Sequence, residues 1–233
     1  MMPPRKFVIW RDAFLTVIQE PEIAAPLKAA SLTEDLKAWT TCLTSAVVTS
    51  CGQLGWLAAA KGHRLDELPQ AGQEYLGMDV MAFPTRNDVG PCGAGVSPAV
   101  LKQSDRDAAI PPDMTAGGTP APQARGRWRL PVAAFESENH RSDDRVAYSL
   151  WKVLCVRADL RVVFAFRRDW DESRQTVDAV GRDVIGSLSA AERISLAGET
   201  VMIIGNRGEG ETFPRGYFKM WLLDSNVGRF EKV

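Results

Sequence analysis

The feature that most constrains the fold is an alternation of amphipathic helices and short apolar runs in the second half of the chain. Asp143 to Val156 carries apolar side chains at helical spacing, and Asp171 to Leu188 does the same. Leu160 to Phe166 and Glu199 to Gly205 are almost entirely apolar, which is typical of strands buried on both faces. Tyr217 to Leu223 is predicted to be a last strand. This order predicts an α/β protein whose central sheet is covered by helices on both faces.

The first third of the chain is predicted to be helical. Arg11 to Gln19 has one apolar side, and a break is expected at Pro21 and Pro26 because proline disrupts helix interiors. The segment Ser31–Glu34 resembles a capping box, which makes Glu34 part of a helix start. The long helix that follows is predicted to end near Gly62.

The middle of the chain is predicted to hold two strands separated by an insertion. Tyr75 to Phe83 and Arg129 to Glu138 have the composition of strands. Between them, residues 84–126 are dominated by Pro, Gly, Ala, Ser and Asp, and are interpreted as a long insertion loop. With 233 residues, the chain is expected to form a single domain, residues 1–233, that contains this loop.

Composition excludes several classes of protein. No apolar run reaches the roughly 18 residues that a membrane helix needs, so no membrane association is expected. The first twelve residues lack a signal-peptide pattern, and a cytoplasmic location is expected. The cysteines form no CxxC pair and only two histidines are present, which argues against structural zinc. No GxSxG motif or phosphate-binding loop occurs, and GNRGEG at residues 205–210 is interpreted as a hairpin turn.

The residues that could carry chemistry are acids at the ends of apolar strands. Glu136 and Glu138 alternate with Ser137, so both point to the same face of one predicted strand. Two neighbouring carboxylates repel unless a positive group lies between them, and Mg²⁺ prefers carboxylate oxygen. Asp79 lies inside another apolar run and is costly to bury without a partner. If the two strands pair, Asp79 and Glu136 converge, and Glu138 is placed to bind a second ion or to orient water. Taken alone, Glu-x-Glu is a weak motif and is better explained by a strand that simply leaves the core.

A strand acid followed by a strand with Glu-x-Glu, then helix, strand and helix, resembles the PD-(D/E)xK nuclease superfamily. The resemblance spans about Tyr75 to Arg168 without the insertion, and FESENHRSDDRVAYSLWKVLCVRADLRVVFAF is its best part. It implies a restriction-endonuclease-like mixed sheet flanked by helices, with a helical N-terminal region. It also implies that Asp79 and Glu136 are metal-binding acids for Mg²⁺ or Mn²⁺, that DNA is the partner, and that the reaction is phosphodiester hydrolysis.

Two departures from that family pattern concern single positions. Gly77 and Met78 precede Asp79, so the family's proline is absent. Glu138 stands where the family has lysine, and Lys152 on the next helix is the candidate replacement. At about 100° per residue, however, Lys152 lies nearly opposite the apolar stripe of that helix, so a surface position is equally expected.

Substrate contacts are expected just after the Glu-x-Glu strand. Asn139, His140, Arg141 and Arg145 are the candidates for binding phosphate, although each also fits a turn or a solvated surface. The net charge of −1 requires any DNA contact to be local, because dedicated nucleic-acid binders are usually basic. The leading hypothesis is a metal-dependent endonuclease, and the alternative is an inactive module of the same fold with a nucleic-acid-binding or regulatory role. A homodimer is compatible with either.

Overall fold

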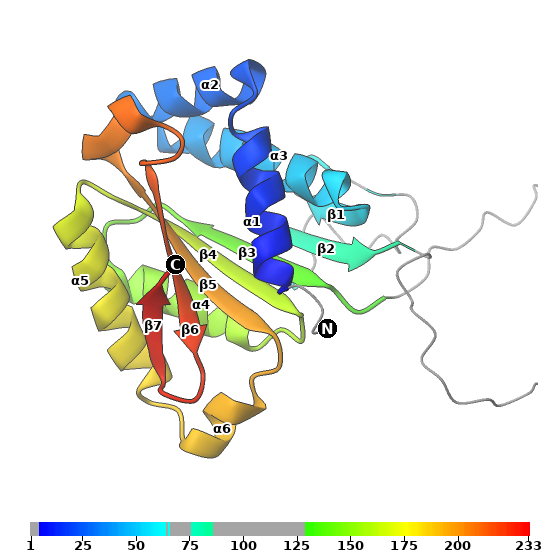
Figure 1. Cartoon of the computed structure of the whole chain (residues 1–233), viewed down its shortest axis with the longest axis vertical. Coiled ribbons are helices and arrows are strands. Elements are labelled where there is room, and N and C mark those ends of the chain that lie inside the picture. Colours follow the sequence, from blue (N-terminus) through cyan, green and yellow to red (C-terminus); the bar gives the residue numbers. More distant parts are fainter. Residues whose placement is uncertain (1–4, 64, 66–75, 86–128) are drawn as a thin grey trace, which may run out of the picture.

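A mixed sheet between two layers of helices forms the centre of the molecule (Figure 1). The computed structural model describes residues 5–63, 65, 76–85 and 129–233, and all statements below concern these residues. The helices are α1 (Lys6–Val17), α2 (Pro21–Leu32), α3 (Leu36–Gln53), α4 (Asp143–Leu154), α5 (Trp170–Val180), the π-helical turn η2 (Gly181–Ile185), α6 (Ala190–Ser195) and the 3-10 helix η3 (Arg207–Thr212). The strands are β1 (Trp56–Ala60), β2 (Val80–Pro84), β3 (Ala133–Glu138), β4 (Leu160–Arg167), β5 (Glu199–Asn206), β6 (Phe218–Asp224) and β7 (Arg229–Lys232).

The strands lie in the sheet in the order in which they occur in the chain. The pairs β1–β2 and β2–β3 are antiparallel, β3–β4 and β4–β5 are parallel, and β5–β6 and β6–β7 are again antiparallel. A parallel pair requires a crossover, and α4 provides it between β3 and β4. The predicted α/β class with a mixed, helix-flanked sheet is therefore confirmed.

Each face of the sheet has its own core. On one face, Phe135 and Phe164 pack with Trp10 and Phe14 of α1, and ring centroids of Trp10 and Phe135 lie 5.1 Å apart. On the other face, Ala134 belongs to the cluster that α4 and α5 cover. The near-continuous apolar composition of β4 follows from this arrangement, because both faces of the strand are buried.

The helical N-terminal region is present, but its predicted boundaries were wrong. A break does precede Pro21, because α1 ends at Val17 and Pro21 starts α2, where its missing N–H would have no helical partner. The break expected at Pro26 is wrong, because α2 continues through this residue. The expected capping box is also wrong. Ser31 lies within α2 and hydrogen-bonds the buried Tyr217 hydroxyl at 2.5 Å. The cap of α3 is Asp35, whose carboxylate accepts the Ala38 N–H at 3.0 Å.

The long helix predicted to reach Gly62 ends earlier. α3 stops at Gln53, Gly55 adopts a left-handed φ of 71°, and the chain continues as β1. The alanine-rich sequence of β1 gave no strand signal, and its pairing with β2 determines its structure.

The remaining predictions for the C-terminal half need smaller corrections. The segment GNRGEG does lead into the connection between antiparallel β5 and β6, as a hairpin requires, but that connection is longer than a turn and most of the segment forms η3. The predicted helix 171–188 is divided into α5 and η2, and α6 and β7 were missed. The predicted insertion, residues 84–126, lies almost entirely outside the described residues. Among the helices described, none is both long and apolar enough to cross a membrane.

Candidate active site at the β2–β3–α4 junction

Asp79 and Glu136 lie side by side where β2 begins. Val80 pairs with Phe135 in the antiparallel register, so the residue before Val80 reaches Glu136. The Asp79 N–H donates to Glu136 Oε1 at 3.2 Å, and the Ser137 N–H donates to Asp79 Oδ2 at 2.7 Å. These reciprocal bonds hold the two acids at a common position, although they are 57 residues apart in the chain.

Lys152 reaches these acids from α4. Its Nζ lies 2.8 Å from Glu136 Oε2 and donates to the Gly77 carbonyl at 2.7 Å. Gly77 has a left-handed φ of 66°, so glycine suits this turn before β2. The lysine therefore bridges the turn before β2 and the strand β3, and it does not point to solvent.

The pKa of Glu136 is unusual for a carboxyl group. Burial raises it to about 7, an effect that the Asp79 charge reinforces and that the hydrogen bond and charge of Lys152 oppose. Only 5% of the residue is exposed. At neutral pH this carboxyl group is therefore stabilised when it binds a proton or when a further positive charge lies beside it.

Glu138 does not join this pair. Its Oε1 accepts the His140 N–H at 2.8 Å, so its side chain is engaged with the loop that follows β3. His140 is exposed, and its Nδ1 accepts the Ser142 N–H at 3.0 Å. Among the described residues, no three His, Cys, Asp or Glu side chains form a group that could hold a metal ion. The structure thus brings two of the three predicted acids together.

The predicted substrate-binding residues occupy three different environments. Asn139 donates from Nδ2 to the Thr40 hydroxyl and to the Leu36 carbonyl, which fixes the end of β3 to α3. Arg141 is 81% exposed at its side chain and pairs with Glu34. Arg145 is exposed on α4.

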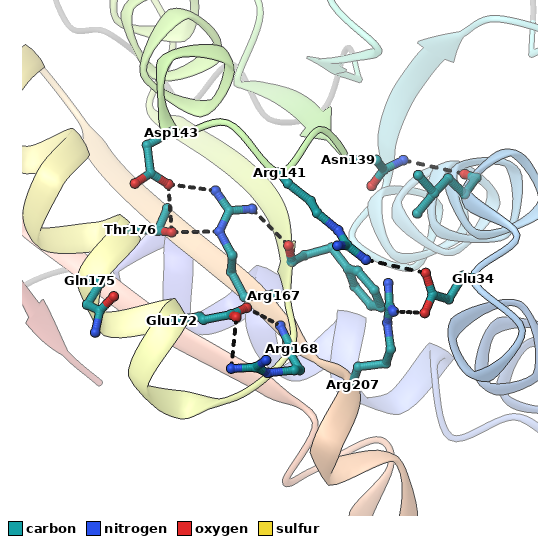
Figure 2. Close-up of a pocket in the computed structure, with 12 residues that line it drawn as sticks. Glu34, Asn139, Arg141, Asp143, Arg167, Arg168, Glu172, Gln175, Thr176 and Arg207 are labelled. Carbon is teal, nitrogen blue, oxygen red and sulfur yellow. Dashed lines mark hydrogen bonds and ion pairs between the residues drawn. The ribbon is translucent and has the colours of Figure 1, made fainter.

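Sequence reasoning missed a cavity lined by arginines beside the same end of β3 (Figure 2). Its volume is about 440 Å³, and its lining includes Arg141, Arg167, Arg168 and Arg207. Arg167 is the last residue of β4 and Arg168 follows it, whereas Arg207 follows β5 in the segment interpreted as a turn. The sequence signal that could have revealed the cavity is an arginine just after the carboxyl ends of two neighbouring parallel strands.

No family model matches this chain, and no curated protein or solved structure matches it either.

Proposed function

We propose that the chain is a metal-dependent endonuclease of restriction-endonuclease-like fold that hydrolyses phosphodiester bonds of DNA. The order β2, β3, α4, β4, α5 agrees with the order of elements that the sequence resemblance implies. In that resemblance, an acid of the first strand and an acid of the second strand act together with a lysine. The proposal therefore requires that an acid of each strand and a lysine lie close together in the folded protein.

The observation that carries the proposal is the contact of Asp79, Glu136 and Lys152. The two carboxyl groups are linked through backbone N–H groups, and Lys152 Nζ lies 2.8 Å from Glu136. Lys152 on the neighbouring helix is therefore our candidate for the lysine that the strand lacks. A buried acid, a partly buried acid and a cation at a strand end are a costly arrangement, and such groups are more common at reactive sites than in structural cores.

Asp79 and Glu136 are the residues that would hold Mg²⁺ or Mn²⁺. Mg²⁺ is commonly bound through one or two carboxylates together with water and substrate phosphate, so this donor set suits the ion. When bound, the ion would supply a polarised phosphoryl oxygen and an activated water. Lys152 is positioned to neutralise negative charge beside Glu136, and Glu138 is the candidate for orienting water. Asn139, His140, Arg141 and Arg145 are the candidates for holding the DNA strand.

A cleavage assay on plasmid and linear DNA with Mg²⁺ or Mn²⁺ tests the proposal. We expect Glu136→Ala to abolish cleavage while the thermal unfolding transition stays cooperative. Glu231→Ala, which removes an exposed glutamate from β7, is the matched control and should cleave normally. Undiminished cleavage by Glu136→Ala would refute the nuclease.

A second candidate is a module of the same fold that binds DNA or a protein without cleaving. Its support is that Lys152 already neutralises Glu136, and that the described acids form no group of three. Calorimetric titration with Mg²⁺ or Mn²⁺ separates the two candidates. Heat of binding that Asp79→Asn removes supports the nuclease, and no binding supports the module.

A further inference from the structure

The arginine-lined cavity lies at the carboxyl ends of the parallel strands β3 and β4 and is distinct from the Asp79–Glu136 pair. Crevices at such strand ends commonly bind ligands in α/β proteins. Figure 2 shows arginine side chains that reach the cavity from the loop after β3, from the end of β4 and from the start of η3. Acidic residues Glu34, Asp143 and Glu172 face them.

The arginines have different roles. Arg167 is buried and fully engaged: its Nε donates to Thr176 at 2.6 Å, and its remaining nitrogens bond Asp143 and two backbone carbonyls. It therefore joins β4 to α4 and α5 and has little capacity for a ligand. Arg141 and Arg207, by contrast, both point at a single carboxylate, that of Glu34.

Glu34 is an unusual partner for two guanidinium groups. It lies in the loop between α2 and α3 with a left-handed φ of 58°, which a glutamate rarely adopts. Its side chain is 55% exposed, and its carboxylate is placed between two arginines that belong to different elements. Arg207 is held in place from the other side, because its guanidinium lies 4.7 Å from the centre of the Phe166 ring. The carboxylate thus occupies the position of an anion between two cations, Arg207, which packs on Phe166, and the exposed Arg141.

Two residues that line the cavity each carry a buried polar atom that has no hydrogen-bond partner within the described part of the chain. They are the buried Nε of Arg207, a donor, and the buried Oδ1 of Asn139, an acceptor. Buried polar groups are normally satisfied, so an unpartnered donor next to an anion position is an observation that points to a ligand. Guanidinium groups bind phosphate as well as carboxylate through paired N–H donors, so phosphate is an anion that can take the place of the Glu34 carboxylate.

We propose that this cavity is a phosphate-binding site in which the Glu34 carboxylate holds the place of the phosphate and is displaced when the ligand binds. Arg141 and Arg207 provide the direct contacts, and Arg168 lies at the rim with a side chain that is 73% exposed. The site is autoinhibited because the Glu34 carboxylate neutralises Arg141 and Arg207 in the free protein. A phosphate must therefore compete with Glu34 to bind.

A phosphate of a DNA strand is the source that we favour, and this assignment rests on the proposed nuclease function. Asn139 follows Glu136 by three residues, so the two Cα atoms are at most about 10 Å apart. That span equals about three base-pair steps along the axis of duplex DNA, at 3.4 Å each. Because Asn139 lines the cavity, a DNA strand bound there would have Glu136 within a few base steps of the bound phosphate.

The test measures binding without cleavage. The full chain carrying Glu136→Gln is titrated, in the absence of divalent metal, with inorganic phosphate, a deoxymononucleotide and a labelled single-stranded oligonucleotide. Adding Glu34→Gln should tighten binding about tenfold, because a competing charge is removed, and adding Arg207→Gln should weaken it at least as much. Arg229 and Glu231 form an exposed pair on β7, and replacing either with glutamine should change nothing.

The outcomes are distinct. Equal affinity with and without Glu34→Gln, or binding that survives both Arg141→Gln and Arg207→Gln, overturns the phosphate site. If only phosphate and the mononucleotide respond to Glu34→Gln, the site stands and its ligand is a free phosphate compound, not DNA. Thermal unfolding of each variant shows that lost binding is not lost folding. Because Glu136→Gln is present throughout, the result is independent of whether the wild-type protein cleaves DNA.

Discussion

Replacing Glu136 with glutamine should alter how stability depends on pH. Burial raises the pKa of this carboxyl group from an ordinary value of 4.5 to about 7 in the folded protein. Between these two values the folded state keeps the proton and the unfolded state has lost it, so the folded state binds more protons. The free energy of unfolding therefore falls as pH rises from about 4.5 to about 7, and it levels off above the folded pKa.

The size of the effect follows from the same two values. One pH unit corresponds to about 1.36 kcal/mol, so the interval from 4.5 to about 7 amounts to a loss of about 3 kcal/mol. Glutamine keeps the shape of the side chain and cannot ionise. The difference in unfolding free energy between Glu136→Gln and the wild type should thus shift in favour of the variant by up to about 3 kcal/mol between pH 4.5 and pH 8.

Urea denaturation of both proteins at several pH values measures this difference directly. All other titrating groups are common to the two proteins and largely cancel. Two further backgrounds sharpen the test. Asp79→Asn should reduce the effect, because the Asp79 charge raises the Glu136 pKa, and Lys152→Met should enlarge it, because Lys152 lowers that pKa. Parallel pH dependences for the wild type and Glu136→Gln would show that the carboxyl group is not destabilised in the folded state.

Three further predictions concern other contacts. Mg²⁺ affinity, measured by calorimetry, should rise about tenfold per pH unit below 7 and level off above it, because Glu136 must lose its proton to bind metal; an affinity that is constant over this range would contradict its role as a ligand. Arg167→Met should lower the free energy of unfolding by about 2 kcal/mol, since it removes the bonds to Thr176 and Asp143, and urea denaturation would detect this loss. Asp35→Ala should cost about 1 kcal/mol in the same assay through loss of the α3 cap, and an unchanged midpoint would argue against that cap.

The parts of the fold that could be predicted are those in which local pattern and burial agree. β4 is apolar throughout because helices cover both of its faces, and α4 starts at the predicted Asp143 because its buried side chains recur at helical spacing. β1 could not be predicted in this way. Its sequence WLAAA has weak strand propensity, and only the pairing with β2 selects the extended form.

The false cap at Ser31 shows how a tertiary contact overrides a local motif. The Ser31 hydroxyl bonds the Tyr217 hydroxyl, 186 residues away in the chain, so it is not available to a helix end. Glu34, the expected partner of that cap, instead extends toward Arg141 and Arg207. A contact between residues so distant in the chain leaves no periodic signal in the sequence.

The position of Lys152 could be predicted only in part. The helical wheel correctly places it far from Leu150, but the buried face of α4 also includes Ser149, which is about 60° from Lys152 around the helix axis. Helical side chains also lean toward the N-terminus of their helix, and the lysine stem is long. These two facts allow Lys152 Nζ to reach Glu136 from a position that the wheel assigns to solvent.

The paired charges also explain how a chain of net charge −1 could bind DNA. Arg141 and Arg207 share the Glu34 carboxylate, so the free surface has little positive field to attract nucleic acid at a distance. A phosphate that displaces Glu34 replaces one anion by another between the same guanidinium groups, one of which, Arg207, is already largely shielded from water. Such a site discriminates by fit, since only an anion that bonds both arginines better than the tethered carboxylate can enter. The net charge of the chain is then no argument against a nucleic-acid substrate, because Glu34 already neutralises Arg141 and Arg207 in the free protein.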